Sequence, residues 1–211
     1  MKPLSLTLKN FGPYINETID FTKFEDSSLF LISGKTGSGK TTIFDGMSYA
    51  LFGESSGKLR LGKEMRSTFA DPSEATEVTL LFKHNEFLYE LNRLPEQELF
   101  KKRGTGVRKQ SAKISLIVKD AQGKELRAYS KRREVDELIQ ELLHLNANQF
   151  AQIVLLPQGE FRTFLIAKSD EKEKVLRNLF GTELYQLFSE NLKERLKIAN
   201  QEIQETQQKI E

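Results

Sequence analysis

The sequence contains no cysteine and no tryptophan, and it has only two histidines, His84 and His144. Without cysteine there is no disulfide framework, no thiolate metal site and no cysteine nucleophile, and two histidines are too few for a histidine-rich metal centre. No apolar run approaches the roughly 18 residues that a membrane span needs, and no signal-type apolar stretch follows Met1. These absences favour a cytoplasmic protein with no membrane partner.

Core-forming residues, in contrast, are plentiful. The 211 residues include 15 phenylalanines and are 38% hydrophobic and 29% charged, which excludes wholesale disorder. A chain of this length predicts one domain, with room for an appendage.

The net charge of +2, from 32 basic and 30 acidic residues, says little about a polyanionic partner. The distribution of charge is more informative, because residues 99–119 contain no acidic side chain. The basic residues of this segment are Lys101, Lys102, Arg103, Arg108, Lys109, Lys113 and Lys119.

The N-terminal quarter of the chain is predicted to form strands of a sheet followed by a helix. Leu4–Leu8 alternates apolar and polar residues, which predicts a half-buried strand, and Thr18–Phe21 is its expected hairpin partner. Leu29–Ile32 is a continuous apolar run, a pattern typical of a strand buried on both faces of an α/β sheet. Residues 41–52 carry apolar side chains at helical spacing, and Gly53 is expected to end that helix.

The rest of the chain is expected to be β-rich and then helical. Strand candidates lie at 77–82, 87–91, 114–118 and near Leu126. A hairpin turn is predicted at Ala121–Lys124, between the last two of them. A helix is expected over Val135–Leu145, a second buried strand over Ile153–Leu156, and helix from Asp170 onward.

The last stretch has apolar or small residues in alternating steps of four and three, at Leu192, Leu196, Ala199, Ile203, Thr206 and Ile210. This heptad spacing predicts the start of a coiled coil cut within its length, with an ordinary amphipathic terminal helix as the alternative. We therefore expect a globular lobe over residues 1–182 and a coiled-coil helix over 183–211.

One segment carries a recognisable chemistry. Residues 34–41 fit the pattern G-x-x-x-x-G-K-[ST] between an apolar run and an amphipathic helix, which is the context that a phosphate-binding loop requires. A chance match in a chain of this length is roughly a one-in-a-hundred event. The residues expected to bind nucleotide are Gly34, Lys35, Thr36, Gly37, Ser38, Gly39, Lys40, Thr41 and Thr42.

The chemistry of such a loop follows from its residues. The glycines let backbone amides approach a phosphate, and the dipole of the following helix favours negative charge at its N-terminus. Lys40 is expected to reach the β- and γ-phosphates of ATP as a catalytic group, and the Thr41 hydroxyl to ligate Mg²⁺.

An acidic partner for this loop is missing. Phosphoryl transfer by such proteins needs an acidic residue at the end of another apolar strand. The nearest candidate, Leu116–Asp120, is interrupted by Lys119 and is better placed in a hairpin, and Ile153–Leu156 runs into Pro157 and Gln158. The sequence therefore contains a phosphate-binding loop without the acidic residue that would complete an active site.

Taken together, the motifs resemble the N-terminal ATPase lobe of the SbcC family, the large subunits of bacterial SbcCD DNA-end nucleases. These are ABC-type ATPases with long coiled coils, related to the structural maintenance of chromosomes proteins. The matching stretches are Leu8–Tyr14, Ser33–Asp45, Ala50–Gly53, Ala70–Pro72 with Glu77–Val78, Lys102–Gly106 and Leu155–Phe161.

The resemblance implies an α/β fold: an ABC-type half-domain with a mixed sheet and an antiparallel β subdomain. It implies that Gln158 is a second catalytic residue and Mg²⁺ ligand, approaching the metal and the attacking water. In the family the signature motif and the acidic strand lie in a C-terminal lobe, and no Leu-Ser-Gly-Gly-type stretch occurs here. The implied partners are that lobe, a second copy joined through two ATP molecules, an SbcD-type nuclease and double-stranded DNA ends.

The acid-free segment suits sequence-independent contact with a phosphate backbone. We expect Lys101, Lys102, Arg103, Arg108 and Lys109 to contact DNA from a hairpin tip. A second basic cluster, Lys131–Arg133, is a weaker candidate, and a solvated loop is the alternative reading of both.

Three functions compete at this stage. The first is the SbcC-type lobe, an ATP hydrolase subunit inactive as a fragment, near the nucleoid. The second is a self-contained kinase or other NTPase, against which the missing acid argues. The third is a chromosome-organising coiled-coil ATPase, which the sequence barely separates from the first; the matches at Pro157–Phe161 and Lys102–Gly106 favour the SbcC type.

Overall fold

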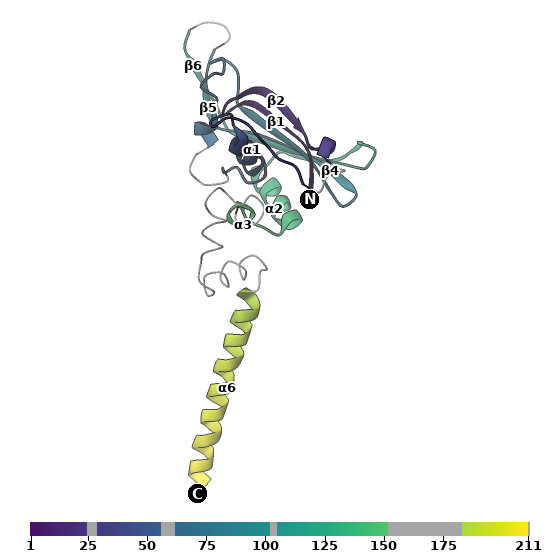
Figure 1. The fold of residues 1–211 in the computed structure, drawn as a ribbon. Coiled ribbons are helices and arrows are strands. Elements are labelled where there is room, and N and C mark those ends of the chain that lie inside the picture. The colour runs from purple at the N-terminus through teal and green to yellow at the C-terminus, as the bar shows by residue number, and fades with distance from the viewer. Residues whose placement is uncertain (25–28, 56–61, 102–104, 152–182, 211) are drawn as a thin grey trace. The chain divides into compact units, whose positions relative to one another are not determined.

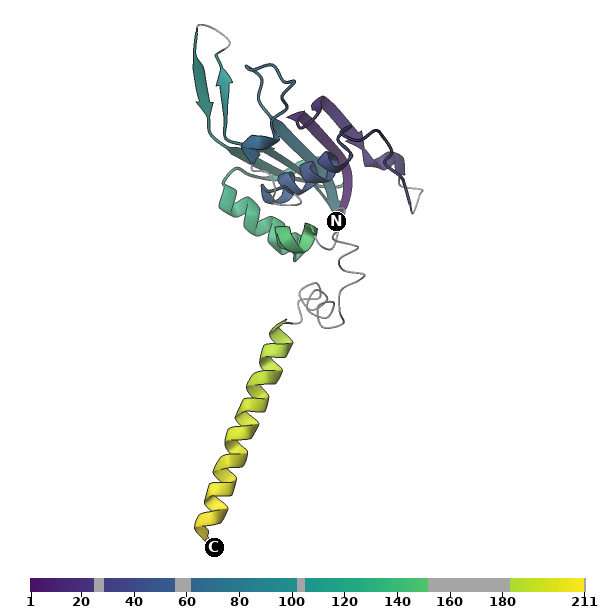
Figure 2. The same ribbon diagram turned by 60° about the vertical axis from the view of Figure 1, so that its left-hand side comes forward.

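The computed structural model describes residues 1–24, 29–55, 62–101, 105–151 and 183–210. The chain divides into two compact units, residues 1–157 and 158–211, and each is described by itself. Within the described residues, the first unit consists of a curved antiparallel sheet, a small two-stranded sheet and three α-helices (Figures 1 and 2).

The main sheet has six strands in the order β2-β1-β3-β4-β7-β8, and every neighbouring pair is antiparallel. The strands expected from alternating segments are confirmed, because each of them lies in this sheet. Their bounds are β1 Lys2–Phe11, β2 Tyr14–Asp20, β3 Glu77–His84, β4 Phe87–Leu94, β7 Lys113–Lys119 and β8 Glu125–Tyr129.

The two faces of the sheet differ in chemistry. Alternation places Leu6, Leu80, Leu91 and Leu116 in one buried row, since the register pairs these residues strand by strand. The opposite face carries small polar residues, such as Thr7 bonded to Thr18 at 2.9 Å. One face therefore packs against helices, as is usual for an antiparallel sheet.

The buried face is covered by α1 (Lys40–Phe52), α2 (Arg132–Leu143) and the short α3 (Ala147–Phe150). Two short 3-10 helices, η1 (Phe21–Phe24) and η2 (Gly62–Met65), complete the unit. The expected helices are thus confirmed, with α2 beginning and ending slightly earlier than its apolar spacing suggested.

Helix α1 lies very close to β1 because one of its positions has no side chain. A Cβ on Gly46 would come within 2.6 Å of Leu8 Cδ2. The helix ends at Gly53, which has φ 76° and donates its amide to Tyr49 O at 2.7 Å. Glycine suits such a left-handed helix end.

The expected buried strand at Leu29–Ile32 is wrong for this structure. These residues form no strand, and Leu29 and Leu31 are 87% and 88% exposed, with Phe30 at 46%. An apolar run becomes a buried strand only where neighbouring strands offer hydrogen bonds and cover, and no described strand pairs with this one.

The second, smaller sheet is a hairpin of β5 (Gln97–Phe100) and β6 (Val107–Gln110), and we call residues 97–110 the basic hairpin. Within β5, Leu99 is fully buried, and the Phe100 amide donates to Pro72 O at 2.9 Å. The predicted turn at 121–124 is also confirmed. Asp120 accepts hydrogen bonds there from the amides of Gln122 and Lys124, at 3.0 and 2.8 Å.

The second unit contains α6 (Glu183–Ile210), a helix of 28 residues. The apolar side chains Leu192, Leu196 and Ile203 are 50%, 62% and 54% exposed along it. Among the described helices, none is apolar over a length that could cross a membrane. The expectations for Ile153–Leu156, for Gln158 and for helix between Asp170 and residue 182 lie outside the described residues.

Candidate nucleotide-binding site

The phosphate loop lies between the exposed Leu29–Ser33 segment and α1. Gly37 and Gly39 have φ of 83° and 92°, in the left-handed region that L side chains rarely adopt. The Lys40 ammonium donates to the carbonyl oxygens of Gly34 and Lys35, at 2.8 Å each. These two bonds draw residues 34–40 into a closed loop.

The loop presents exposed backbone next to the N-terminus of α1. Residues 33–38 are exposed, and a Cβ on Gly37 would meet nothing within 4 Å, so backbone groups there face open space. Helix α1 begins at Lys40, and no side chain caps its N-terminus. Uncapped amides and the positive end of a helix dipole together favour an anion.

A turn from the first hairpin supports the loop from behind. The Tyr14 hydroxyl donates to Gly39 O at 3.2 Å, and burial followed by the charge of Glu17 raises the Tyr14 pKa, so this group stays a donor. A Cβ on Gly39 would meet Pro13 Cγ at 2.5 Å, and a Cβ on Gly12 would meet Thr42 Cγ2 at 2.5 Å. Two glycines therefore make this close packing of turn against loop possible.

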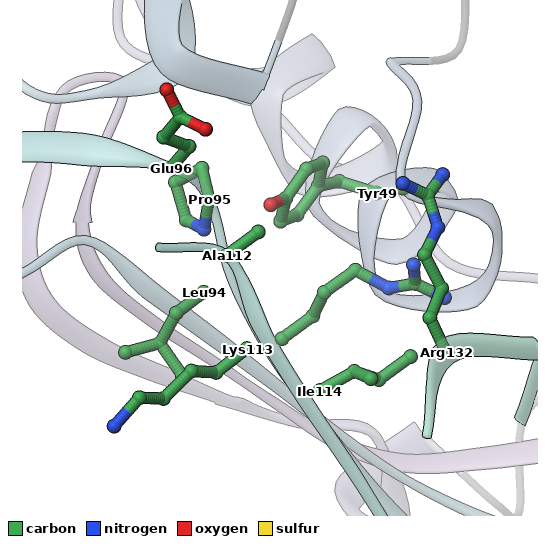
Figure 3. A pocket seen from close by; sticks show the side chains of 10 residues that line it. Tyr49, Leu94, Pro95, Glu96, Ala112, Lys113, Ile114 and Arg132 are labelled. Carbon is green, nitrogen blue, oxygen red and sulfur yellow. The ribbon is translucent and has the colours of Figure 1, made fainter. Parts of the chain in front are cut away.

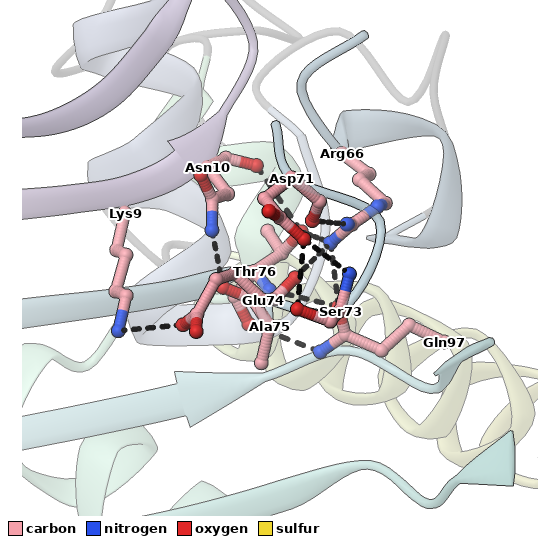
Figure 4. Close-up of polar contacts among 9 residues, drawn as sticks. All are labelled: Lys9, Asn10, Arg66, Asp71, Ser73, Glu74, Ala75, Thr76 and Gln97. Atoms are coloured by element: carbon pink, nitrogen blue, oxygen red, sulfur yellow. Dashed lines mark hydrogen bonds and ion pairs between the residues drawn. The ribbon is translucent and has the colours of Figure 1, made fainter. Parts of the chain in front are cut away.

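The same turn is linked to the basic hairpin by a polar network (Figure 4). Asn10 donates to Ala75 O at 2.9 Å, and Asn10 O accepts from Thr76 Oγ1 at 3.1 Å. Gln97, at the start of β5, accepts from the Thr76 amide at 2.8 Å and donates to Thr76 O at 3.1 Å. Gln97 is 6% exposed, so these bonds are shielded from water.

Arg66 cross-links residues 71–76, the loop that carries Ala75 and Thr76 of this network. Its guanidinium donates to the carbonyl oxygens of Glu74 and Asp71 at 2.6 and 2.8 Å, and to Gln97 Oε1 at 3.3 Å. Sequence reasoning did not find Arg66 or Gln97, because neither lies in a motif. The base of the basic hairpin is thereby fixed against the segment that supports the phosphate loop.

The basic hairpin presents part of its charge to solvent. Lys101 and Arg108 are exposed, and Lys109 pairs with Glu96 at 2.8 Å. That pairing raises the Lys109 pKa, first through the hydrogen bond and then through the charge of Glu96. Lys102 and Arg103 lie outside the described residues.

The second basic cluster is balanced by acids on its own helix. Lys131 pairs with Glu134 at 3.0 Å, Arg132 with Asp136 at 3.3 Å, and Arg133 with Glu137 at 2.7 Å. Of these three cations, Arg132 also faces a cleft, which is treated below.

The missing acid is not supplied by the described residues. Asp120, the nearest candidate in the sequence, is engaged in the turn between β7 and β8. Within the described ranges, no three acidic or histidine residues gather as a metal site would require. Thr41, exposed in the first turn of α1, is the one predicted metal ligand that the structure describes, because Gln158 lies outside those ranges.

Comparison with known proteins shows which family the chain resembles over most of its length. Residues 5–211 match a protein family described as AAA domain. SbcC, the C component of the SbcCD nuclease, from Lactococcus lactis is 46% identical over 197 residues, which are 92% of this chain and 18% of that protein. The proteins of the same name from Staphylococcus aureus (strain MRSA252) and Vibrio cholerae are 45% and 43% identical over all of this chain and 20% and 21% of theirs.

The chain thus spans about a fifth of the length of these curated relatives. Among solved structures, one described as "Structural biochemistry of ATP-driven dimerization and DNA stimulated activation of SMC ATPases" matches with a TM-score of 0.46 and 16% identity. That match covers 85% of this chain and 99% of the other.

Proposed function

The chain belongs to the AAA domain family, and from this premise we propose that it is the ATP-binding lobe of an SbcC-type ATPase. In this proposal ATP-driven dimerisation and hydrolysis control the processing of DNA ends, as in break repair and hairpin cleavage, by a partner nuclease of the SbcD type. The observation that carries the proposal is the phosphate loop, whose lysine closes residues 34–40 into an exposed loop at the start of α1.

The proposed roles follow from the positions of the residues. The amides of residues 34–42 bind the phosphates, Lys40 moves from its carbonyl partners to the β- and γ-phosphates, and Thr41 ligates Mg²⁺. When bound, Mg²⁺ neutralises phosphate charge. Gln158 is the proposed second group near the metal. The acidic strand and signature motif would come from a C-terminal lobe, and the second copy of the protein would face this loop.

The basic hairpin is the proposed DNA contact. Its exposed cations suit phosphate backbones, which bind without sequence preference and with strong salt dependence. The network through Gln97, Thr76 and Asn10 supports this role, because it holds the hairpin base in a defined position relative to the nucleotide site.

Nucleotide binding is tested by calorimetry of the 211-residue chain with ATP and Mg²⁺. We expect measurable binding, and its loss in Lys40→Ala, because that variant removes the charge that reaches the phosphates. Lys83→Ala, which removes an exposed lysine of β3, is the matched control and is expected to bind as the parent does. Equal binding by Lys40→Ala would refute the site.

Hydrolysis is tested by adding a separately produced C-terminal lobe. We expect turnover near background for the chain alone and a large increase when the lobe is present, because the acid that activates water lies there. Full turnover by the chain alone would contradict the proposed division and favour a self-contained NTPase.

The nuclease partner separates this proposal from a chromosome-organising ATPase. We expect the full-length protein to co-purify with a metal-dependent nuclease. An intact protein that binds ATP and dimerises, yet carries no nuclease, would favour the chromosome organiser.

DNA contact is tested with the full-length, ATP-bound protein and a DNA duplex. Changing Lys101, Lys102 and Arg103 to Glu is expected to lower the affinity and flatten its dependence on salt. Lys124→Glu, in the turn between β7 and β8, is the matched control. Unchanged affinity and salt dependence in the triple variant would remove the hairpin from the contact surface.

A further inference from the structure

A cleft of about 280 Å³ lies at the base of the basic hairpin. Its walls come from the end of α1, from the residues just before β5, from those just after β6 and from the first residue of α2 (Figure 3). The polar groups that line it are those of Tyr49, Arg93, Glu96, Lys113 and Arg132.

Arg93 forms the buried wall of this cleft. It is 5% exposed, and its guanidinium caps α1 by donating to Ala50 O at 3.0 Å and Leu51 O at 3.2 Å. One of its nitrogens also binds Asp136 at 2.9 Å. Alternation along β4 aims Arg93 inward with Leu91, which is the sequence signal that could have singled it out.

The charges at the cleft do not balance. Arg93 and Arg132 share one carboxylate, since Asp136 Oδ1 accepts from Arg93 and Oδ2 from Arg132 at 3.3 Å. Tyr49 cannot supply the missing negative charge, because burial raises its pKa to about 12 and keeps it protonated. Glu96, the acid that lines the cleft, already pairs with Lys109. Within the described part of the chain, Arg93 and Arg132 thus have a single carboxylate between them, and Lys113 adds a further cation to the lining.

The Arg132 side chain is 73% exposed at the mouth of the cleft whereas Arg93 is buried, so an anion that entered there would contact one solvated and one desolvated cation. The position of Arg132 further favours a bound anion, because Arg132 is the first residue of α2, where the helix dipole disfavours cations. The N-cap residue Lys131 makes no side-chain capping bond, so the first amides of α2 add further donors.

We propose that this cleft is an anion site that binds one backbone phosphate of nucleic acid, held by Arg132, the buried Arg93 and the Tyr49 hydroxyl. Figure 3 shows the Arg132 guanidinium and the Tyr49 ring at the same side of the cleft, whereas the Lys113 ammonium points to the other side. The cleft volume of about 280 Å³ leaves ample room for a phosphate group.

The position of the cleft favours nucleic acid as the source of that phosphate. Leu94, Pro95 and Glu96 lead into β5, and Ala112 and Lys113 follow β6, so the cleft continues the surface of the basic hairpin toward the sheet. A strand that contacts the hairpin can place a further phosphate at Arg132. The inference therefore rests on the DNA contact proposed above and extends it to a defined site.

The test compares two neighbouring arginines in the full-length protein. Arg132→Gln removes the cleft cation, and Arg133→Gln removes a cation that is also exposed but does not line the cleft. Duplex affinity is measured by fluorescence anisotropy over a series of salt concentrations. We expect Arg132→Gln to weaken binding roughly five- to tenfold and to lower the salt slope by about one, and Arg133→Gln to stay within about twofold of the parent.

Equal effects of the two variants, or none from either, would overturn the cleft site. If the hairpin variant Lys101→Glu still loses affinity in that case, the proposed DNA contact stands without the cleft. A second arm measures thermal stabilisation by inorganic phosphate at constant ionic strength. Saturable, Arg132-dependent stabilisation together with unchanged duplex binding by Arg132→Gln would assign the cleft to free phosphate and overturn the nucleic-acid inference.

Discussion

At the scale of single residues, the proposed nucleotide site depends on a glycine whose side-chain space is already filled. Gly39 combines a φ of 92° with the approach of Pro13 and Tyr14, so alanine there would be strained and also blocked. Gly123 has a similar φ of 83° in a turn, but its side-chain position is open. Alanine substitutions at Gly39 and at Gly123 therefore separate the effect of backbone strain from that of steric exclusion.

We expect Gly39→Ala to abolish ATP binding, because the turn must move away from the loop. Gly123→Ala is expected to lower the free energy of unfolding by about 1 kcal/mol and to leave ATP affinity unchanged. Calorimetric titration and denaturant unfolding measure the two effects. Similar ATP affinities for both variants would show that the close packing at Gly39 is dispensable.

Tyr49 makes stability depend on pH at the alkaline end. Burial raises its pKa from 10.0 to about 12, against the attraction of Arg93 and Arg132. Between these values the folded state keeps the phenolic proton and the unfolded state loses it, so the contribution is complete below pH 10 and is lost as pH rises toward 12. The expected loss is about 1.4 kcal/mol per pH unit within that window.

Tyr49→Phe keeps the ring and removes the titrating group. Unfolding free energies measured from about pH 9 to about pH 11.5, roughly spanning that window, should therefore fall less steeply for the variant than for the parent. Parallel pH profiles would mean that Tyr49 ionises as freely in the folded chain as in the unfolded chain.

At the scale of elements, Arg93 joins three of them. From β4 it binds the last carbonyls of α1 and the Asp136 carboxylate of α2. The end of α1, the helix that follows the phosphate loop, is thus linked to the helix that carries the second basic cluster. Removing a partner from a buried ion pair is costly because the other groups remain desolvated.

Arg93→Ala is expected to lower the free energy of unfolding by about 3 kcal/mol. Arg133→Ala, which removes an exposed ion pair with Glu137, is expected to have a much smaller effect, because water screens that pair. Urea denaturation of both variants checks the contrast. A cost for Arg93→Ala as small as that of Arg133→Ala would show that α1 needs no such cap.

At the scale of the whole molecule, the apolar segment at Leu29–Leu31 is left uncovered. Leu29 and Leu31 are nearly fully exposed, and rings of Phe24 and Phe30 stack beside them at 4.9 Å. Burying a leucine contributes about 1.5–3 kcal/mol, so this segment drives association with any suitable surface.

We expect the isolated chain to self-associate, and the double variant Leu29→Ser, Leu31→Ser to weaken that association at least roughly tenfold. Phe69→Ser, which removes a different side chain that is 76% exposed, is the control. Sedimentation velocity at several concentrations measures the change. Equal association by parent and double variant would place the contact elsewhere.

The sequence predicted the elements of the main sheet well because alternation is a local signal. Leu6 and Leu8 face the core, as their spacing in Leu4–Leu8 indicated, and Gly53 ends α1 as expected. The prediction of a buried strand at Leu29–Ile32 was wrong, because an apolar run contains no information about which strands will pair with it and cover it. It also passed over Arg66 and Gln97, because the Arg66–Gln97 and Gln97–Thr76 hydrogen bonds join residues 31 and 21 positions apart.

The sequence by itself determined the phosphate loop. Its glycines and Lys40 are consecutive or nearly so, and short-range backbone preferences therefore suffice to shape it. Only the tertiary structure decided the cleft at the hairpin base. Tyr49, Arg93 and Arg132 lie on three separate elements; sheet pairing and helix packing bring them to one cleft, where the two arginines share the Asp136 carboxylate. Such a charge excess arises from folding and has no signature in any one stretch of residues.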